Sequence, residues 1–440
     1  MKERIRKTGW LLLTAWIFVL LPILWFYAPE GYEALGEHKF EAWRMISAFF
    51  AAPLLICLLL LLIPAKHKEN DFSQRPHLLL PDIFLILYSL LITVSFLLSP
   101  YRGESLWGTR GWRTGYLTEL MMIAFYLFAR VFPLHLPAVL CSAGISSAAL
   151  LFIAITDRFG FYLFPWQGGD SSFVATIGNM DWYAGCLALM LAFSAGLFVF
   201  SLSAADGQRT VRKKRLFLSG ILVFAAILSA YTQSSVTGYL LPVLTLLCLL
   251  FTESDRIPAG KWLRCASGGL LIPAAAGMLL LPVFQTAGVF SDSFGNGRGA
   301  IWRISWLLAE ARSPMQTAFG IGPGAFAAYA YQQDSPFWPQ LYSAFGPVRL
   351  TNAHHALMTV FLEEGLFAAV VWLLFVLSSF LMLLRAYRNR RHPLMLIALL
   401  SIVLLGAVQA LTFRTVTATP VLLFLSGSAI KAGNPRTERT

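Results

Sequence analysis

Two adjacent histidines carry the clearest chemical signal in this 440-residue sequence. They occur in Asn352-Ala353-His354-His355, where a polar and aromatic segment meets an apolar one. An imidazole suits proton transfer near neutral pH because its ordinary pKa is about 6.5. Glu363 and Glu364 follow about two to three helical turns later. This spacing is typical either of a catalytic site or of a polar pair in which His354 and Glu363 satisfy one another in the interior.

A second group of candidate residues begins at Arg298. This arginine lies in a stretch rich in Gly, Ser and Asn, residues 291–299, and Trp302 lies about one helical turn beyond it. A guanidinium is permanently charged, and its planar fork of donors fits phosphate oxygens. We therefore expect Arg298 to hold phosphate groups, whereas Arg303 and Arg312 are better placed to anchor the segment to lipid headgroups.

The elements that must position these residues are membrane helices. Hydrophobic residues make up 57% of the chain and charged residues 13%, whereas roughly a quarter of a soluble protein is charged. The apolar runs have the length of about 17–25 residues that a hydrocarbon layer of roughly 30 Å requires. The sequence predicts an all-α polytopic membrane protein with about twelve transmembrane helices, near residues 10–28, 44–64, 79–99, 116–133, 137–155, 182–202, 216–231, 236–251, 265–284, 356–384, 393–411 and 416–430.

The net charge of +12 follows this topology. If the N-terminus is inside, lysines and arginines concentrate in the inner segments, as in Lys2–Lys7, Arg209–Arg215 and Arg385–Arg391. This is the positive-inside bias, and it predicts that both termini are cytoplasmic. We therefore expect membrane lipids and not nucleic acid as partners. The first apolar run lacks a small-residue cleavage site, so we expect it to be retained as a helix.

We expect a single transmembrane domain, residues 1–440, because no internal repeat or low-complexity linker interrupts the chain. Its exceptional connection is an extracytoplasmic loop, residues 285–355, between the ninth and tenth predicted helices. The loop contains an amphipathic helical stretch at 300–311, a Gly/Pro turn at 320–324 and an aromatic-rich arm. Loops of this length are usually functional, and the aromatic residues favour a position along the membrane surface.

Two further arginines lie in a shorter outer loop. Arg110 and Arg113 alternate there with Gly108, Gly111 and Gly115. The positive-inside bias disfavours arginine in outer loops. Their clustering at this position therefore requires a specific reason.

We expect neither a metal ion nor a cofactor. The five cysteines lie in or beside apolar segments, and none is at metal-ligand spacing. The glutamates of the first outer loop, Glu30, Glu33, Glu37 and Glu41, are candidate ligands, but spacings of three and four place them along one solvated helix face. No His-x-x-x-His or Asp-x-Asp spacing supports a metal site.

Taken in order, the motifs resemble those of the bacterial O-antigen ligase and O-antigen polymerase superfamily of membrane glycosyltransferases. The later motifs are Arg298…Trp302, Phe319-Gly-Ile-Gly-Pro-Gly-Ala-Phe326, Asn352-Ala-His354 and Glu363-Glu-Gly365. Weaker upstream motifs are Leu98-Ser-Pro, Leu106-Trp-Gly108, Arg113-Thr-Gly115 and Ile177-Gly-Asn179. The helix number, the orientation and the long outer loop agree as well, so the resemblance covers most of the chain.

The resemblance implies transfer of a glycan from an undecaprenyl pyrophosphate carrier to an acceptor hydroxyl on the outer face of the inner membrane, with inversion at the anomeric centre. It implies that His354 is the general base or the acceptor-positioning group, and that Arg298 stabilises the pyrophosphate leaving group. Because arginine takes the role of a cation, this mechanism is metal-independent. The substrate-binding residues that we expect are Arg110, Arg113, Trp302, Asn352, His355, Glu363 and Arg414.

Two positions depart from the family pattern. His355 stands where the family usually has Asn, and Val236 stands where it usually has an Arg that also binds the pyrophosphate. Either Arg110, Arg113 or Arg414 replaces the second arginine, or the substrate differs.

Several activities stay open. The acceptor is lipid A–core in a ligase, which we place first because the chain lacks a soluble C-terminal domain. It is the growing glycan in an O-antigen polymerase and a protein hydroxyl in an O-oligosaccharyltransferase. A transporter or flippase of lipid-linked sugars belongs to another class, although the sequence lacks the paired Gly/Pro-broken helices that inverted-repeat transporters often show. A scaffolding protein would not need the Arg and His cluster. The expected location is the bacterial cytoplasmic (inner) membrane, as a multi-pass protein.

Overall fold

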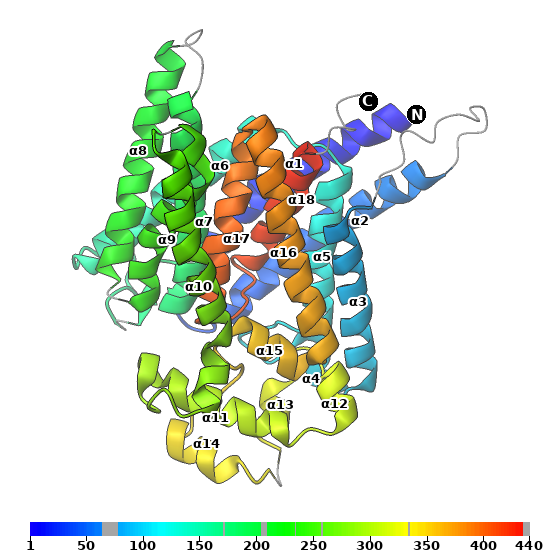
Figure 1. The fold of residues 1–440 in the computed structure, drawn as a ribbon. Coiled ribbons are helices and arrows are strands. Elements are labelled where there is room, and N and C mark those ends of the chain that lie inside the picture. Colours follow the sequence, from blue (N-terminus) through cyan, green and yellow to red (C-terminus); the bar gives the residue numbers. More distant parts are fainter. Residues whose placement is uncertain are drawn as a thin grey trace.

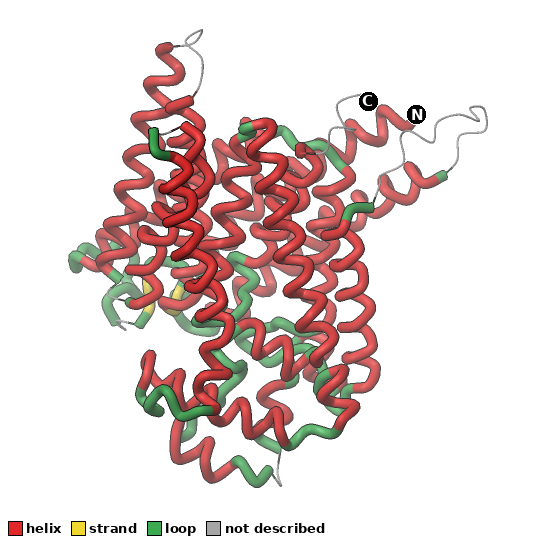
Figure 2. The backbone as a smooth tube through the Cα atoms, in the orientation of Figure 1, coloured by secondary structure: helices red, strands yellow, loops and turns green. Residues whose placement is uncertain are grey.

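The computed structural model describes residues 1–63, 78–169, 172–203, 209–233, 235–256, 258–332 and 335–433. Nearly all regular structure in this part is helical (Figure 2). The described strands are β1 (Phe173–Val174) and β2 (Gly178–Asn179), which pair antiparallel in a short hairpin. Residue 64 of the second predicted transmembrane helix and residues 333 and 334 of the long loop lie outside the described residues.

Each predicted apolar stretch contains a helix, but the tenth, 356–384, is divided: its first part ends at Glu363, and a second helix begins at Gly365, which has a φ of 91°. These helices are α1 (Lys2–Phe26), α2 (Leu35–Leu62), α3 (Leu80–Leu98), α5 (Tyr116–Val131), α6 (Leu136–Arg158), α7 (Met180–Ser203), α8 (Arg209–Thr232), α9 (Val236–Glu253), α10 (Gly260–Thr286), α16 (Gly365–Arg390), α17 (Pro393–Gln409) and α18 (Thr419–Gly433). Among the described residues, nine helices are long and apolar enough to cross a membrane. The helices α5, α17 and α18 have 16, 17 and 15 residues, at or below the lower end of the roughly 17–25 that a span requires. The all-α polytopic architecture is confirmed, while the number twelve stays a prediction.

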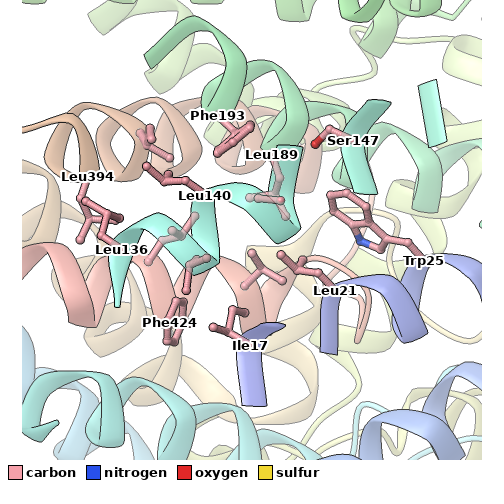
Figure 3. A pocket seen from close by; sticks show the side chains of 15 residues that line it. Ile17, Leu21, Trp25, Leu136, Leu140, Ser147, Leu189, Phe193, Leu394 and Phe424 are labelled. Carbon is pink, nitrogen blue, oxygen red and sulfur yellow. The ribbon is translucent and has the colours of Figure 1, made fainter. Parts of the chain in front are cut away.

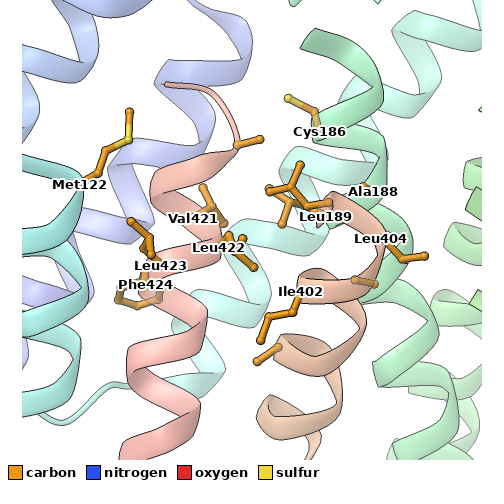
Figure 4. Close-up of a cluster of buried hydrophobic side chains, with 14 of the residues drawn as sticks. Met122, Cys186, Ala188, Leu189, Ile402, Leu404, Val421, Leu422, Leu423 and Phe424 are labelled. Atoms are coloured by element: carbon orange, nitrogen blue, oxygen red, sulfur yellow. The ribbon is translucent and has the colours of Figure 1, made fainter. Parts of the chain in front are cut away.

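The helices α7, α17 and α18 form the centre of the bundle. Nearly all side chains of α17 and α18 are buried. A Cβ atom on Gly196 of α7 would lie 2.6 Å from Cγ1 of Ile397 on α17, so glycine lets these two backbones approach. Figure 4 shows Leu189 of α7, Ile402 of α17 and Val421 of α18 meeting in this core.

The outer helices expose apolar side chains. Phe217 and Phe224 of α8 and Ile272 of α10 are 69%, 68% and 71% exposed. Such surfaces are unfavourable in water but fit a hydrocarbon environment. The exposure pattern therefore supports a multi-pass membrane protein independently of helix length.

The start of α3 is tied to the end of α5 by a buried ion pair. Asp82 accepts hydrogen bonds from Nε and Nη2 of Arg130 at 2.7 and 2.9 Å and from the hydroxyl of Tyr126 at 2.8 Å. The same carboxylate accepts the backbone N–H of Leu79, which precedes α3. One carboxylate thus neutralises a buried arginine and caps a helix.

Lys39 is buried within α2, against the end of α1. Its ammonium donates to the carbonyl oxygens of Leu24, Trp25 and Tyr27 at 2.8, 3.4 and 3.3 Å. The last carbonyls of a helix lack intrahelical partners and carry partial negative charge. The end of α1 therefore solvates this cation within an apolar bundle.

Short helices form a cap at one end of the bundle. They are α4 (Arg102–Trp107), α11 (Phe294–Glu310), α12 (Pro314–Phe319), α13 (Phe326–Ala330), α14 (Trp338–Phe345) and α15 (Ala356–Glu363). In Figure 1, α11 to α14 lie at the end of the bundle opposite the two termini. The basic starts of α1 and α8 and the basic end of α16 lie at the end where the termini lie (Figure 1). The most cationic segments and the cap are therefore on opposite sides.

An apolar cavity lies between α1, α6, α7, α17 and α18 (Figure 3). The cavity has a volume of about 40 Å³ and is partly open to the surroundings. Leu21, Leu140, Phe193 and Phe424 line it, and Ser147 contributes a hydroxyl. None of the described residues that line it is charged, so this cavity is no site for a phosphate group.

We expect Asp82→Ala to lower the melting temperature of the purified protein, because Arg130 would be left buried without a counter-ion. Removing one partner of a buried pair costs about 3–5 kcal/mol. The double variant Asp82→Ala/Arg130→Met should recover part of this loss. Asp292→Ala removes a carboxylate of which 56% of the side chain is exposed, and should change stability by at most about 1 kcal/mol. Equal losses in the single and double Asp82 variants would contradict this assignment.

Candidate functional site

Three acceptors hold the guanidinium of Arg298. Its Nε donates to the carbonyl oxygen of Leu411 at 2.6 Å, and its Nη1 donates to that of Gly295 at 2.6 Å. Its Nη2 donates to both carboxylate oxygens of Asp181, at 3.0 and 3.1 Å. Asp181 lies in the first turn of α7, and Leu411 follows α17. An arginine of the long loop is thereby joined to two central helices.

The backbone conformation before Arg298 explains where its side chain points. Gly295, Asn296 and Gly297 have φ values of 59°, 62° and 88°, in the left-handed region. Glycine adopts this conformation without strain, and Asn is among the side-chain-bearing residues that adopt it most readily. These three residues turn the chain sharply before the regular part of α11. The turn returns the guanidinium to the carbonyl oxygen of Gly295.

His354 is held by a compact polar turn immediately before α15. Its own backbone has a φ of 46°, also left-handed. Its N–H donates to Oδ1 of Asn352 at 2.9 Å, and the N–H of Ala353 donates to Oγ1 of Thr359 at 3.2 Å. Asn352 is thus a positioning residue for His354, consistent with its place in the motif.

Aromatic rings connect His354 with Arg298. The imidazole lies edge-on to Phe413, with centroids 5.4 Å apart, and Phe413 follows the Leu411 carbonyl by two residues. The ring of Trp112 packs against Phe413 at 4.4 Å and against Trp182 at 5.7 Å. Trp182 directly follows Asp181 in the chain. We name Arg298, Asp181 and His354 the Arg–Asp–His cluster.

The charges of the cluster act on the imidazole. Burial lowers the pKa of His354 from its ordinary 6.5, the carboxylate of Asp181 raises it, and the guanidinium of Arg298 lowers it. The net direction is downward, so the imidazole is neutral at pH 7. Its Nδ1 is buried without a hydrogen-bond partner in the described part of the chain. A neutral imidazole beside a fixed guanidinium can accept a proton close to a bound anion.

The Gly/Pro turn between α12 and α13 is clamped from two sides. Glu363 accepts the N–H groups of Gly324 and Phe326 at 3.0 and 3.1 Å. On the other side, Ser99 donates to the carbonyl oxygen of Ile321 at 2.6 Å. The turn thus joins the end of α15 to the segment after α3.

Two glycines make this close packing possible. Gly322 has a φ of 117°, and a Cβ there would lie 2.3 Å from the hydroxyl oxygens of Ser99 and Ser105. Gly324 has a φ of 67°, and a Cβ there would lie 2.5 Å from Cα of Gly108. Motifs that are far apart in the sequence therefore meet here, around a turn that tolerates no side chain at these positions.

His355 and Glu363 are occupied by structural contacts. His355 caps α15: its Nδ1 accepts the N–H of Met358 at 3.2 Å, and its Nε2 lies 3.1 Å from the carbonyl oxygen of Met278. Both side chains are 1% exposed. The substrate-binding roles that we expected for them have no support in this geometry. The alternative pairing of Glu363 with His354 is also not observed, because Glu363 binds the Gly/Pro turn.

Trp302 is fully buried and packs with Phe290 and Phe294 at centroid distances of 5.9 and 6.1 Å. A side chain without exposed surface cannot contact a substrate in this conformation. Its place one turn after Arg298 is explained by packing of α11. The substrate-binding role that we expected for it is therefore not supported.

Arg113 and Arg414 are paired with glutamates. Arg113 binds both carboxylate oxygens of Glu37 at 3.0 Å through Nε. Arg414 is 5% exposed and donates to Glu119 at 3.0 Å and to Glu364 at 2.6 Å. Arg113 thus ties the loop before α5 to α2, and Arg414 ties the segment after α17 to α5 and to the end of α15. Both guanidinium groups are occupied by carboxylates.

Arg110 is the exception among these arginines. It is exposed, without an ion-pair partner among the described residues, and lies two residues before Trp112, which packs against Phe413. Val236, where the family has arginine, begins α9 and is 68% exposed. Of the three candidates for replacing that arginine, Arg110 is the one that remains available.

Two further sequence interpretations need correction. Arg312 does not anchor the loop to headgroups: it is 6% exposed and donates to the carbonyl oxygens of Phe361 and Leu362 at 2.7 and 3.1 Å. Burial lowers the pKa of Arg312 to about 10. The first-loop glutamates do not share one helix face either, because Glu30 and Glu33 lie in the turn before α2.

Asp181 and Phe413 were missed by the sequence analysis. A signal for Asp181 was available, because an arginine held in a partly buried site needs an anion nearby. Asp181 also lies two residues after Asn179 of the Gly178-Asn179 motif, at the start of an apolar helix. Phe413 gives no such signal, because an aromatic residue between two apolar helices is common in membrane proteins.

A scan against protein-family models found no match for this chain, and a search of curated protein sequences found no relative. The assignment of a function therefore depends on the geometry of the site together with the motifs of the sequence.

We expect Glu363→Ala to release the Gly/Pro turn, because two buried N–H groups would lose their acceptor at about 1–3 kcal/mol each. Hydrogen exchange at Gly324 and Phe326 should accelerate, and Glu363→Gln, which keeps one acceptor oxygen, should give an intermediate rate. Glu310→Ala is the matched control, because Glu310 is exposed at the end of α11. Unchanged exchange in Glu363→Ala would disprove the clamp.

Proposed function

We propose that this protein is a membrane glycosyltransferase of the O-antigen ligase type. It transfers a glycan from an undecaprenyl pyrophosphate carrier to an acceptor hydroxyl. The observation that carries the proposal is that Arg298 and His354, from segments 56 residues apart in the numbering, meet the same short segment after α17: Arg298 donates to the carbonyl oxygen of Leu411, and His354 packs against Phe413. A fixed guanidinium suits a diphosphate, and a neutral imidazole suits a hydroxyl proton.

The proposed reaction is a single displacement. The acceptor oxygen bonds to the anomeric carbon while the bond from that carbon to the pyrophosphate oxygen breaks, which inverts the anomeric centre. The acceptor proton passes to His354, and the electron pair of the broken bond remains on the pyrophosphate, where Arg298 stabilises it. The proton then leaves the imidazolium for solvent, which restores the neutral base.

The proposed topology has twelve transmembrane helices, with the cap outside and both termini in the cytoplasm of a bacterium. Its support is the separation of charges: the basic ends of α1, α8 and α16 lie opposite the cap (Figure 1). Lysine and arginine favour the cytoplasmic side. The three helices of 15 to 17 residues are central or half-buried, so protein as well as lipid surrounds them.

The acceptor defines the subtype. Lipid A–core as acceptor makes the protein a ligase, the growing glycan makes it a polymerase, and a protein hydroxyl makes it an O-oligosaccharyltransferase. The ligase is our first choice, because residues 285–355 form helices that pack on the bundle and no separate soluble unit. A flippase or transporter of lipid-linked sugars is the competing class, and the assay below separates the two.

We expect the protein, reconstituted in proteoliposomes with undecaprenyl pyrophosphate-linked glycan and each acceptor, to form product in the presence of a chelator. His354→Ala should lower the transfer rate by about 10²-fold or more, and Arg298→Ala by about 10²–10³-fold. The control Arg303→Ala removes an arginine of the same helix that pairs with Asp292 at 2.9 Å, and it should retain activity. Movement of the glycan lipid across the bilayer without transfer to any acceptor would favour the transporter.

We expect the rate of transfer to fall in acid. The base must be unprotonated, and burial lowers the pKa of His354 below its ordinary 6.5, against the raising effect of Asp181. The value of kcat/KM should therefore be flat near neutral pH and decrease about tenfold per pH unit below an inflexion under 6.5. An inflexion above 6.5, or one that persists in the residual activity of His354→Gln, would exclude His354 as the base.

A further inference from the structure

We infer that Asp181 is an internal anion that occupies Arg298 until the diphosphate of the donor displaces it, and that it then becomes the counter-ion of protonated His354. This inference rests on the proposed function. It assigns a positioning role to Asp181, which acts first on the group that binds the leaving pyrophosphate and then on the group that receives the acceptor proton.

The guanidinium has one exchangeable edge. Its Nε and Nη1 are held by the backbone carbonyl oxygens of Leu411 and Gly295, both at 2.6 Å. These acceptors are fixed by the chain and cannot leave. Nη2 donates only to Asp181, which is a side chain at the start of a helix. A phosphate oxygen that forms an ion pair with Nη2 of Arg298 must therefore take the place of the Asp181 carboxylate.

Asp181 is free to make this exchange. Its carboxylate accepts hydrogen bonds from Arg298 alone among the described residues, and 22% of its side chain is exposed. Two buried arginine–carboxylate pairs of the described chain differ: Asp82 accepts four hydrogen bonds from three residues, and Glu364 binds both Arg414 and Tyr88. Arg298 itself is 17% exposed. The Asp181–Arg298 pair is thus accessible from outside and loosely held on one side.

Protonated His354 is the cation with which the released Asp181 carboxylate would pair. Its Nδ1 is buried without a partner in the part of the chain that the structure describes. The charge of Asp181 already acts on this imidazole and favours its protonated form, whereas the charge of Arg298 opposes it. Phe413 stands edge-on to the imidazole and brings no charge of its own. Once His354 holds the acceptor proton, Asp181 is the carboxylate whose charge acts on it.

Charge balance gives the exchange its direction. In the free protein the cluster contains one cation, one anion and a neutral imidazole. An arriving diphosphate adds negative charge that repels Asp181 and takes the exposed edge of Arg298. Proton transfer to His354 then creates a second cation, which Asp181 neutralises. Between these two steps Asp181 has no cationic partner, and its negative charge favours the transfer of the proton to His354.

We expect Asp181→Asn to bind inorganic pyrophosphate more tightly than the native protein, because the competing carboxylate is gone. Calorimetry on the full chain in detergent should show a gain of about fivefold or more, the lower range of coupling between linked sites. Arg298→Ala should lose binding. Asp292→Asn is the matched control, because it neutralises an aspartate in an exposed arginine pair, and its affinity should be unchanged.

The same variant should split the kinetic constants. In the transfer assay, Asp181→Asn should lower the KM for the donor, lower kcat, and move the acid inflexion to lower pH, because the imidazolium loses its counter-ion. Asp181→Glu should restore part of kcat. A carboxylate that only held Arg298 in place would instead raise the donor KM when it is replaced.

The outcomes distinguish the two proposals. If the native protein transfers glycan and binds pyrophosphate, but Asp181→Asn binds it equally or more weakly, the exchange is wrong and the glycosyltransferase proposal stands. If the native protein neither binds pyrophosphate nor transfers glycan, the proposed function fails and the inference fails with it. A melting temperature of Asp181→Asn close to that of the native protein shows that the variant is folded.

Discussion

Every charge inside this bundle must be neutralised by the protein itself, because neither lipid nor an apolar core does so. The helix end around Lys39, the Asp82–Arg130 pair and the contacts of Arg414 with Glu119 and Glu364 are three solutions to this constraint. Lys39 joins the consecutive helices α1 and α2, the Asp82–Arg130 pair joins α3 to α5, and Arg414 joins the segment after α17 to α5 and to the end of α15. These charged contacts therefore link particular helices within an apolar core to which α7, α17 and α18 contribute.

The Arg–Asp–His cluster obeys the same constraint with an important difference. Its ion pair is partly exposed, and one of its members is bound on a single edge. The surrounding structure is rigid: the Gly/Pro turn is clamped between Glu363 and Ser99, and Asn352 fixes the backbone of His354. A preorganised frame with one exchangeable contact is what electrostatic stabilisation of a leaving group requires.

The fold could be predicted further than the site. Hydropathy located the long helices because lipid demands long apolar runs, and charge asymmetry matched the separation of basic ends from the cap (Figure 1). The sequence also indicated Arg298 and His354, since their chemistry is unusual beside apolar segments. It could not separate them from Trp302, His355 and Glu363, which share the same motifs but support packing, capping and turn formation. That distinction depends on the direction of each side chain, and local patterns do not encode contacts across the fold.

The acceptor that Leu411 provides for Arg298 lies 113 residues later in the chain. During synthesis, Arg298 and Asp181 have both left the ribosome well before α17 and the segment after it. The hydrogen bond from Arg298 to this carbonyl oxygen can form only after Leu411 has been synthesised, and the contact of His354 with Phe413 is equally late. Nascent chains that stop before the α17–α18 connection would therefore carry both candidate groups without a competent centre, so activity would be acquired only in the last stage of membrane insertion.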